Sequence, residues 1–186
     1  SFVQAVYAQD HTRIQATKWI YQNIPAPFQL LLTSPDGKIT PIQISTPQDS
    51  LYITKYDPYT YPFFTGDGGE LKELYIPKVT AMGTDPTDKF LQVVIAEDIQ
   101  GIHQVAVGVV EISYGASDLE YRCSLEGTLK AGERYYLIVS TPDEGLISVD
   151  RLMLANENWD EGLPVPFDGV DPFGMYYQGT TMQVRW

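Results

Sequence analysis

The chain is poor in the residues that most often carry chemistry at neutral pH, because its 186 residues include one cysteine and two histidines. Cys123 alone cannot form an intrachain disulfide or a CxxC-type zinc or redox site. Zinc needs three or four His or Cys ligands, and Cys123, His11 and His103 lie far apart in sequence. Neither histidine stands in a recognisable nucleophile motif. We expect Cys123 to be an inert, buried strand residue.

Basic charge and long apolar runs are scarce as well. Twelve Lys and Arg stand against 24 Asp and Glu, which gives a formal net charge of −12. Such a chain repels polyanions and anionic headgroups, so nucleic acid is excluded as a partner. No apolar run reaches the roughly 20 residues that span a bilayer, so we expect a water-soluble domain. The start at Ser1-Phe2-Val3, without Met, indicates that a missing flank could hold a membrane segment.

The residues that are abundant favour strands and turns. Thirteen Tyr, fifteen Gly and thirteen Pro accompany a hydrophobic content of 44%, which is enough for a packed core. One helix is predicted over residues 11–24, where Ala16, Trp19, Ile20 and Ile24 recur at helical spacing on one stripe. Pro25 ends that helix.

From residue 28 onward the apolar period changes to two, with turn residues between short runs. This pattern predicts a mainly β fold, a jelly-roll-like β-sandwich of about nine strands with one N-terminal helix. Pro35-Asp36-Gly37 predicts a hairpin between the first two strands. The runs over 90–97 and 103–114 are partly apolar on both faces, which predicts central strands covered on both sides. The predicted strands are residues 28–33, 39–45, 50–55, 71–82, 90–97, 103–114, 119–125, 134–141 and 146–154.

Two regions interrupt this rhythm and hold most of the candidate ligand-binding aromatics. Residues 56–69 are predicted to be an ordered surface loop, and residues 156–186 an irregular tail. Exposed aromatic rings beside carboxylates are typical of sugar sites, although the same rings could instead plug the core. The candidates are Tyr56, Tyr59, Tyr61, Phe63 and Phe64 in the first region and Trp159, Tyr176 and Tyr177 in the second.

The densest carboxylates lie in the same tail, at Asp160, Glu161, Asp168 and Asp171. Glycoside hydrolysis would need two of them held about 5–10 Å apart, and the alternative is a solvated acidic loop. Calcium could be held by oxygen-rich loops at 85–88 or 168–171, but EF-hand spacing is absent from the sequence. The glycine cluster at 66–69 precedes a strand and contains an Asp, so it does not fit a phosphate loop.

The two ends of the chain carry a resemblance. Residues 7–25 read YAQDHTRIQATKWIYQNIP, and residues 155–177 read ANENWDEGLPVPF followed by DGVDPFGMYY. These segments resemble consecutive segments of large multi-spanning bacterial membrane glycosyltransferases related to protein O-mannosyltransferases, as in filamentous green bacteria. In that family the two segments follow one another almost directly. The resemblance therefore implies that residues 27–149 are a β-sandwich insert, framed by a helical segment, 1–26, that pairs with an irregular acidic segment, 150–186.

The resemblance implies a location rather than a catalytic site. The family uses polyprenyl-phosphate sugars, and the extracytoplasmic loop that holds its catalytic carboxylate is absent from this sequence. We therefore predict a non-catalytic extracytoplasmic accessory domain of a membrane glycosyltransferase-like protein, without a cofactor or metal, whose partner would be a glycan or a polyprenyl-linked sugar acceptor. An independent carbohydrate-binding β-sandwich is the alternative, and a glycoside hydrolase is a third hypothesis. The candidate ligand-binding residues are Trp159, Asp160, Glu161, Asp168, Asp171, Tyr176 and Tyr177.

Overall fold

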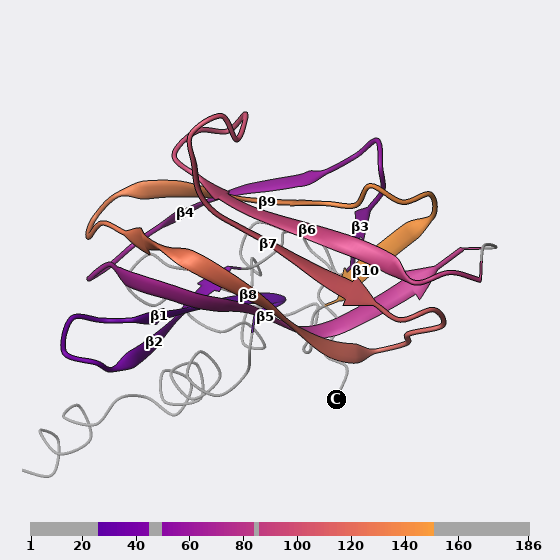
Figure 1. The fold of residues 1–186 in the computed structure, drawn as a ribbon, viewed down its shortest axis with the longest axis horizontal. Coiled ribbons are helices and arrows are strands. Elements are labelled where there is room, and N and C mark those ends of the chain that lie inside the picture. Colours follow the sequence, from indigo (N-terminus) through magenta and orange to yellow (C-terminus); the bar gives the residue numbers. More distant parts are fainter. Residues whose placement is uncertain (1–25, 45–49, 84–85, 151–186) are drawn as a thin grey trace, which may run out of the picture.

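The computed structural model of the chain describes residues 26–44, 50–83 and 86–150. Within these ranges the protein is mainly β, with ten strands in two sheets and no helix. The helix predicted over 11–24 lies outside the described residues, as does the acidic tail. Figure 1 shows the four-stranded sheet above the long strands of the six-stranded sheet.

The larger sheet runs in the order β2-β1-β5-β10-β3, and β8 also pairs with β5. The smaller sheet runs in the order β4-β9-β6-β7. Every pairing between these strands is antiparallel. The strands are β1 (Phe28–Thr33), β2 (Ile39–Ile44), β3 (Ser50–Ile53), β4 (Tyr59–Phe64), β5 (Gly69–Met82), β6 (Lys89–Ala96), β7 (Gln104–Ile112), β8 (Leu119–Leu129), β9 (Arg134–Ser140) and β10 (Leu146–Asp150).

The predicted hairpin between the first two strands is confirmed. The backbone N–H of Gly37 donates to the carbonyl of Ser34 at 2.8 Å, and Gly37 has a φ of 80° that favours glycine. Phe28 pairs with Ile44 at one end of the hairpin and Thr33 with Ile39 at the other.

Both sheets contribute their buried face to one hydrophobic core. In β1, for example, Phe28, Leu30 and Leu32 are buried while the residues between them are half-buried, as a period of two requires. Across the sheets, the rings of Phe28 in β1 and Tyr59 in β4 stack with centroids 5.9 Å apart. Cys123 is fully buried in β8, which confirms its predicted place in a strand.

The two sheets meet closely where β7 runs beside β8, which Figure 1 shows at the front of the molecule. Gly108 in β7 lies so close to β8 that a Cβ atom there would be 2.5 Å from the carbonyl oxygen of Ser124. Gly127 in β8 would place a Cβ atom 2.7 Å from the carbonyl oxygen of Val105. These contacts require glycine on both strands, because the missing side chains let two backbones touch.

The prediction for the two apolar strands is confirmed in part for β6, which is central but leaves Phe90 exposed on its outer face, and it is wrong for β7. β6 lies between β9 and β7, and Val93, Val94 and Ile95 are all buried. β7 is an edge strand of its sheet, and Val107 and Val109 point outward with exposed fractions of 45% and 58%. The apolar run over 103–114 was misleading because the strand beside β7, β8, belongs to the other sheet. β8 therefore covers only the inner face of β7.

The aromatic segment 56–69 was predicted as a loop, and this prediction is wrong for its middle. β4 occupies residues 59–64 and pairs with β9. Pro62 obscured the strand, because proline cannot donate to a ladder. β4 is an edge strand in which proline is tolerated, and Phe63 points into the core.

We call strands β1 to β10 the β unit. Its first and last strands, β1 and β10, meet at one place on β5. Tyr75 pairs with β1 and β8, and Val79 pairs with β10 and β8, so β1 and β10 share the edge of β5 opposite β8. Extending both registers places the start of β1 opposite Ile76 and the end of β10 opposite Lys78. Two residues of strand separate them, about 7 Å. Pro77 lies between the two pairings, where a ladder donor is not needed.

Candidate functional site

The ligand-binding residues predicted in the tail lie outside the described residues. This applies to Trp159, Asp160, Glu161, Asp168, Asp171, Tyr176 and Tyr177. It also applies to His11 and to both residues that open the proposed calcium loops, Asp85 and Asp168. The geometry below therefore comes from the β unit alone.

The aromatic residues of segment 56–69 divide into two groups. Tyr59, Tyr61 and Phe63 face inward along β4, where the rings of Tyr59 and Tyr61 stack with centroids 6.0 Å apart. These three pack against or within the core, as the plug interpretation predicts. Tyr56 and Phe64 do not plug it, because their exposed fractions are 80% and 62%. The ring of Phe64 lies 5.0 Å beneath the guanidinium of Arg134.

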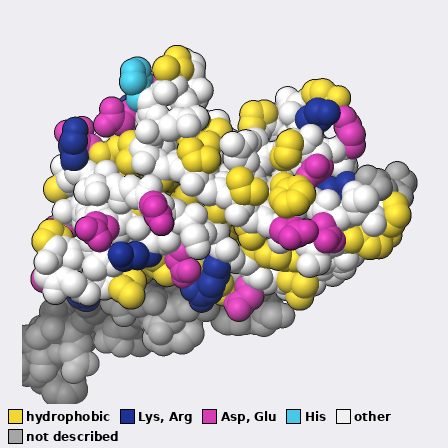
Figure 2. Space-filling view, viewed as in Figure 1, with side chains coloured by type: hydrophobic (Ala, Val, Ile, Leu, Met, Phe, Trp, Pro, Cys, Tyr) yellow, Lys and Arg dark blue, Asp and Glu magenta, His cyan; other side chains and the backbone are white. Residues whose placement is uncertain are grey.

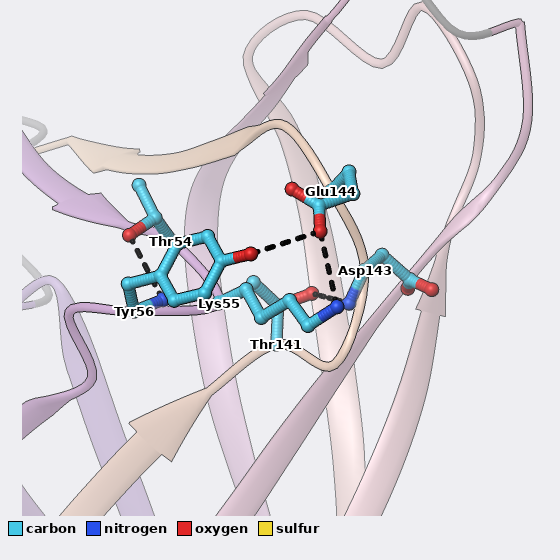
Figure 3. Close-up of polar contacts among 6 residues, drawn as sticks. All are labelled: Thr54, Lys55, Tyr56, Thr141, Asp143 and Glu144. Atoms are coloured by element: carbon cyan, nitrogen blue, oxygen red, sulfur yellow. Dashed lines mark hydrogen bonds and ion pairs between the residues drawn. The ribbon is translucent and has the colours of Figure 1, made fainter.

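Tyr56 is the centre of a polar group that joins two turns, drawn in Figure 3. Its hydroxyl donates to Oε1 of Glu144 at 3.3 Å, and Nζ of Lys55 donates to the same oxygen at 3.0 Å. The Lys55 ammonium also lies 5.9 Å from the centre of the Tyr56 ring. We call Lys55, Tyr56 and Glu144 the Tyr56 cluster. It connects the β3–β4 turn with the β9–β10 turn, which are nearly ninety residues apart in sequence.

Both turns are held by local hydrogen bonds. Oγ1 of Thr54 accepts from the backbone N–H groups of Tyr56, at 3.3 Å, and Asp57, at 3.1 Å. On the other turn, the Asp143 N–H donates to Oγ1 of Thr141 at 3.2 Å. Oδ2 of Asp143 then accepts from the backbone N–H of Phe90 at 2.6 Å, which fastens the turn to β6. The cluster is therefore placed by fixed backbone rather than by free loops.

The charges of the cluster stabilise one another. The hydrogen bond and the charge of Lys55 lower the pKa of Glu144, and Glu144 in turn raises the pKa of Lys55. Lys89, which is 4% exposed, adds a weaker attraction to Glu144. Glu144 is therefore ionised at neutral pH and can accept from hydroxyl groups. An exposed ring face beside such groups can stack on the C–H face of a sugar.

His103, the first residue of the predicted strand 103–114, lies just before β7, and the structure places it beside a carboxylate. Nδ1 of His103 lies 3.0 Å from Oδ2 of Asp98. The same carboxylate accepts from the N–H groups of His103, Ile102 and Gln100, and the first two of these bonds dominate in lowering the pKa of Asp98 to about 2. These bonds fold the β6–β7 loop upon itself. Burial raises the pKa of the Cys123 thiol to about 11, so Cys123 is not a nucleophile at neutral pH.

A hollow lies near the β8–β9 turn. It has a volume of about 250 Å³ and is lined by Glu97, Lys130, Glu133, Arg134 and Tyr135. Oγ1 of Thr65 donates to the carbonyl of Lys130 at 2.5 Å and accepts from the N–H of Glu133 at 3.1 Å, so it holds the backbone of two lining residues. Its two cations and two anions neutralise one another, so it has no net preference for an ion.

The described residues contain neither a cluster of metal ligands nor a membrane-spanning helix. In residues 26–44, 50–83 and 86–150, no group of three or more His, Cys, Asp or Glu could hold a metal ion. Oδ1 of Asp88, the described end of one proposed calcium loop, accepts from the backbone N–H of Tyr114 at 2.6 Å. Over the same ranges, no helix has the length and hydrophobicity to cross a bilayer.

Comparison with known proteins assigns no family. No protein-family model matches the chain, and no curated protein matches it. Among solved structures it is similar to a CocE/NonD family hydrolase from Staphylococcus aureus, with a TM-score of 0.40 and 14% sequence identity. The match covers 69% of this chain and spans only 35% of that hydrolase. A likeness at this level carries no argument about function.

Sequence reasoning named Tyr56 as a candidate aromatic but missed Lys55 and Glu144. No local signal could have found them, because their pairing depends on how the β3–β4 and β9–β10 turns meet in space. The sequence does carry the turn residues themselves, Thr54 in one turn and Asp143 in the other.

Proposed function

We propose that this chain is a non-catalytic, extracytoplasmic accessory domain, inserted into a membrane glycosyltransferase-like protein. We infer further that its two sheets form a jelly-roll-like β-sandwich. The observation that carries the insertion is the meeting of β1 and β10 on one edge of β5. Domains are inserted most readily where their two ends are close, because the host then needs to open by only a short distance. The resemblance at both ends of the chain supports the same arrangement.

The insertion is tested by removing the β unit from the full-length protein. Residues 27–149 are replaced by a linker of three or four Gly and Ser residues, which spans the gap of about 7 Å. The expected product still enters the membrane and resists proteolysis. A matched control replaces only residues 104–129, which removes β7 and β8 and exposes the core, so it should be degraded. If the short-linker protein is degraded as readily as the control, the β unit is not an insert.

Carbohydrate binding is a second candidate function, favoured by the Tyr56 cluster. Among the described residues, Tyr56 is the most exposed large hydrophobic side chain, and Glu144 and Lys55 lie beside it with hydrogen-bonding atoms. Sugars at millimolar concentration should shift the backbone NMR signals of residues 54–57 and 143–145. Tyr56→Ala should abolish these shifts, while Tyr52→Ala, at an exposed tyrosine of β3, should retain them. A glycan array without binding, or equal effects of both substitutions, would overturn this candidate.

A further inference from the structure

The outer face of the four-stranded sheet is almost free of charge. Its members alternate with the core residues of β4, β9, β6 and β7, and most of them are exposed or half-buried. Only two of them are charged, Arg134 in β9 and Glu111 in β7. By contrast, β5 and β8 of the other sheet carry seven charged residues outside the core. The outer face comprises Thr60, Pro62, Phe64, Arg134, Tyr136, Ile138, Ser140, Phe90, Gln92, Val94, Val107, Val109 and Glu111.

The centre of this face is an aliphatic row across three strands. Val94 of β6 pairs with Ile138 of β9 on one side and with Val107 of β7 on the other. Val94 is buried, but Val107 and Val109 remain largely open to solvent. Figure 2 shows hydrophobic side chains grouped over β6 and β7 with few charged ones among them. A contiguous exposed patch of this kind is typical of an interaction surface.

The β6–β7 loop adds two aliphatic side chains to the same face. Ile99 and Ile102 have exposed fractions of 55% and 72%, although Asp98 fixes the surrounding backbone. Gly101 has a φ of 70° and lies against Ile138, because a Cβ atom there would be 2.9 Å from Cδ1 of Ile138. The loop therefore reaches the Ile138 end of the row. Aliphatic side chains held out on a fixed loop are preorganised for contact.

The two charges of the face are self-complementary. Arg134 is at the end of β9 that lies beyond Ala96, since Tyr136 pairs with Ala96. Glu111 is at the opposite end of the face, since it pairs with Phe90 at the start of β6. A two-fold axis in the plane of the face, perpendicular to the line between these charges, brings each Arg134 opposite Glu111 of the second copy. Identical surfaces pair in this isologous way in most homodimers.

We propose that this face binds the same face of a second copy of the chain, with Val107 and Val109 beside its centre and Ile102 at its edge. Two copies of a chain with a net charge of −12 repel one another over most of their surface. The outer face of the four-stranded sheet is where this repulsion is least, and its two charges attract across the axis. The pairing goes beyond the proposed accessory role and does not depend on it, because a free domain could form it equally well.

Sedimentation equilibrium of the whole chain tests the pairing. The wild type should be a dimer at tens of micromolar, and Val109→Lys should raise the dissociation constant about 30-fold or more, because it buries an unpaired charge. Ile39→Lys, on an exposed strand of the other sheet, is the matched control and should leave the dimer unchanged. Ile102→Ser, in the loop, serves as a second variant that does not alter a strand. Circular dichroism checks that each variant is folded.

A charge exchange tests the two-fold geometry. Arg134→Glu and Glu111→Arg should each weaken the dimer, because each places like charges opposite one another, and the double variant should restore it. A wild type that stays monomeric at a protein concentration of about 100 micromolar would overturn the proposal. So would a dimer that Val109→Lys and Ile102→Ser leave intact. A monomer that instead sediments with neutral lipid vesicles would show that the face serves a membrane.

Discussion

Substituting Gly108 by alanine should destabilise the protein more than any ordinary surface change. An added Cβ atom would lie 2.5 Å from the Ser124 carbonyl oxygen and 2.6 Å from Sγ of Cys123. Ordinary contacts between such atoms are roughly 1 Å longer. The Ser124 oxygen belongs to backbone, so relief requires β7 and β8 to separate. Overpacking of a well-filled core costs about 1–3 kcal/mol, and we expect the upper end because two strands must move.

Urea unfolding followed by fluorescence measures this change as a loss in the free energy of unfolding. A loss of about 3 kcal/mol corresponds to a melting temperature lower by roughly 6–12 °C for a chain of this size. Gly127→Ala should behave alike, since its Cβ atom would meet the carbonyl of Val105 at 2.7 Å. Gly66→Ala is the control, because a Cβ atom there meets nothing within 4 Å. Stability of Gly108→Ala within about 0.5 kcal/mol of the wild type would refute the close contact.

Three further predictions concern ionisable groups. Asp98 has a pKa of about 2 in the folded protein, below its usual value of about 3.9 in unfolded chains. The stability that its hydrogen bonds contribute is therefore present above pH 4 and is lost as the pH falls toward 2. A carboxyl NMR titration of Asp98 with a midpoint near 4 would contradict this prediction. With a pKa of about 11, Cys123 should resist a thiol reagent at pH 8 until urea unfolds the chain, and prompt labelling of the native protein would be the opposite result. Lys55→Gln should raise the pKa of Glu144 toward its ordinary value, which the same NMR method detects, and an unchanged titration would show that the pair does not form in solution.

The strands were predictable from sequence wherever one face of a sheet is buried and the other is exposed to solvent. The first predicted strand, 28–33, coincides with β1, because Phe28, Leu30 and Leu32 alternate with half-buried residues. Prediction failed where the position of a strand in its sheet, which local sequence does not show, decides how its residues are accommodated. β4 looks like a loop because Pro62 interrupts it, and only its edge position makes that proline acceptable. β7 looks central because Val107 and Val109 are apolar, although they face solvent.

The candidate site was less predictable than the fold. Tyr56 was named as a candidate aromatic, but its exposure depends on the β3–β4 turn. Its partner Glu144 comes from the β9–β10 turn, which is distant in sequence. The meeting of β1 and β10 on β5 was not predicted from the sequence. It depends on which edge of a long strand each one selects, and periodicity carries no information about that choice.

The cellular location of the full-length protein tests the central claim most directly. Antibodies against residues 26–150 should detect it in the membrane fraction, because the proposed parent spans the membrane. Protease added outside spheroplasts should destroy the signal while a cytoplasmic marker survives, because the proposed accessory domain is extracytoplasmic. Recovery of the full-length protein in the soluble fraction, or protection of the β unit until the membrane is permeabilised, would contradict the account.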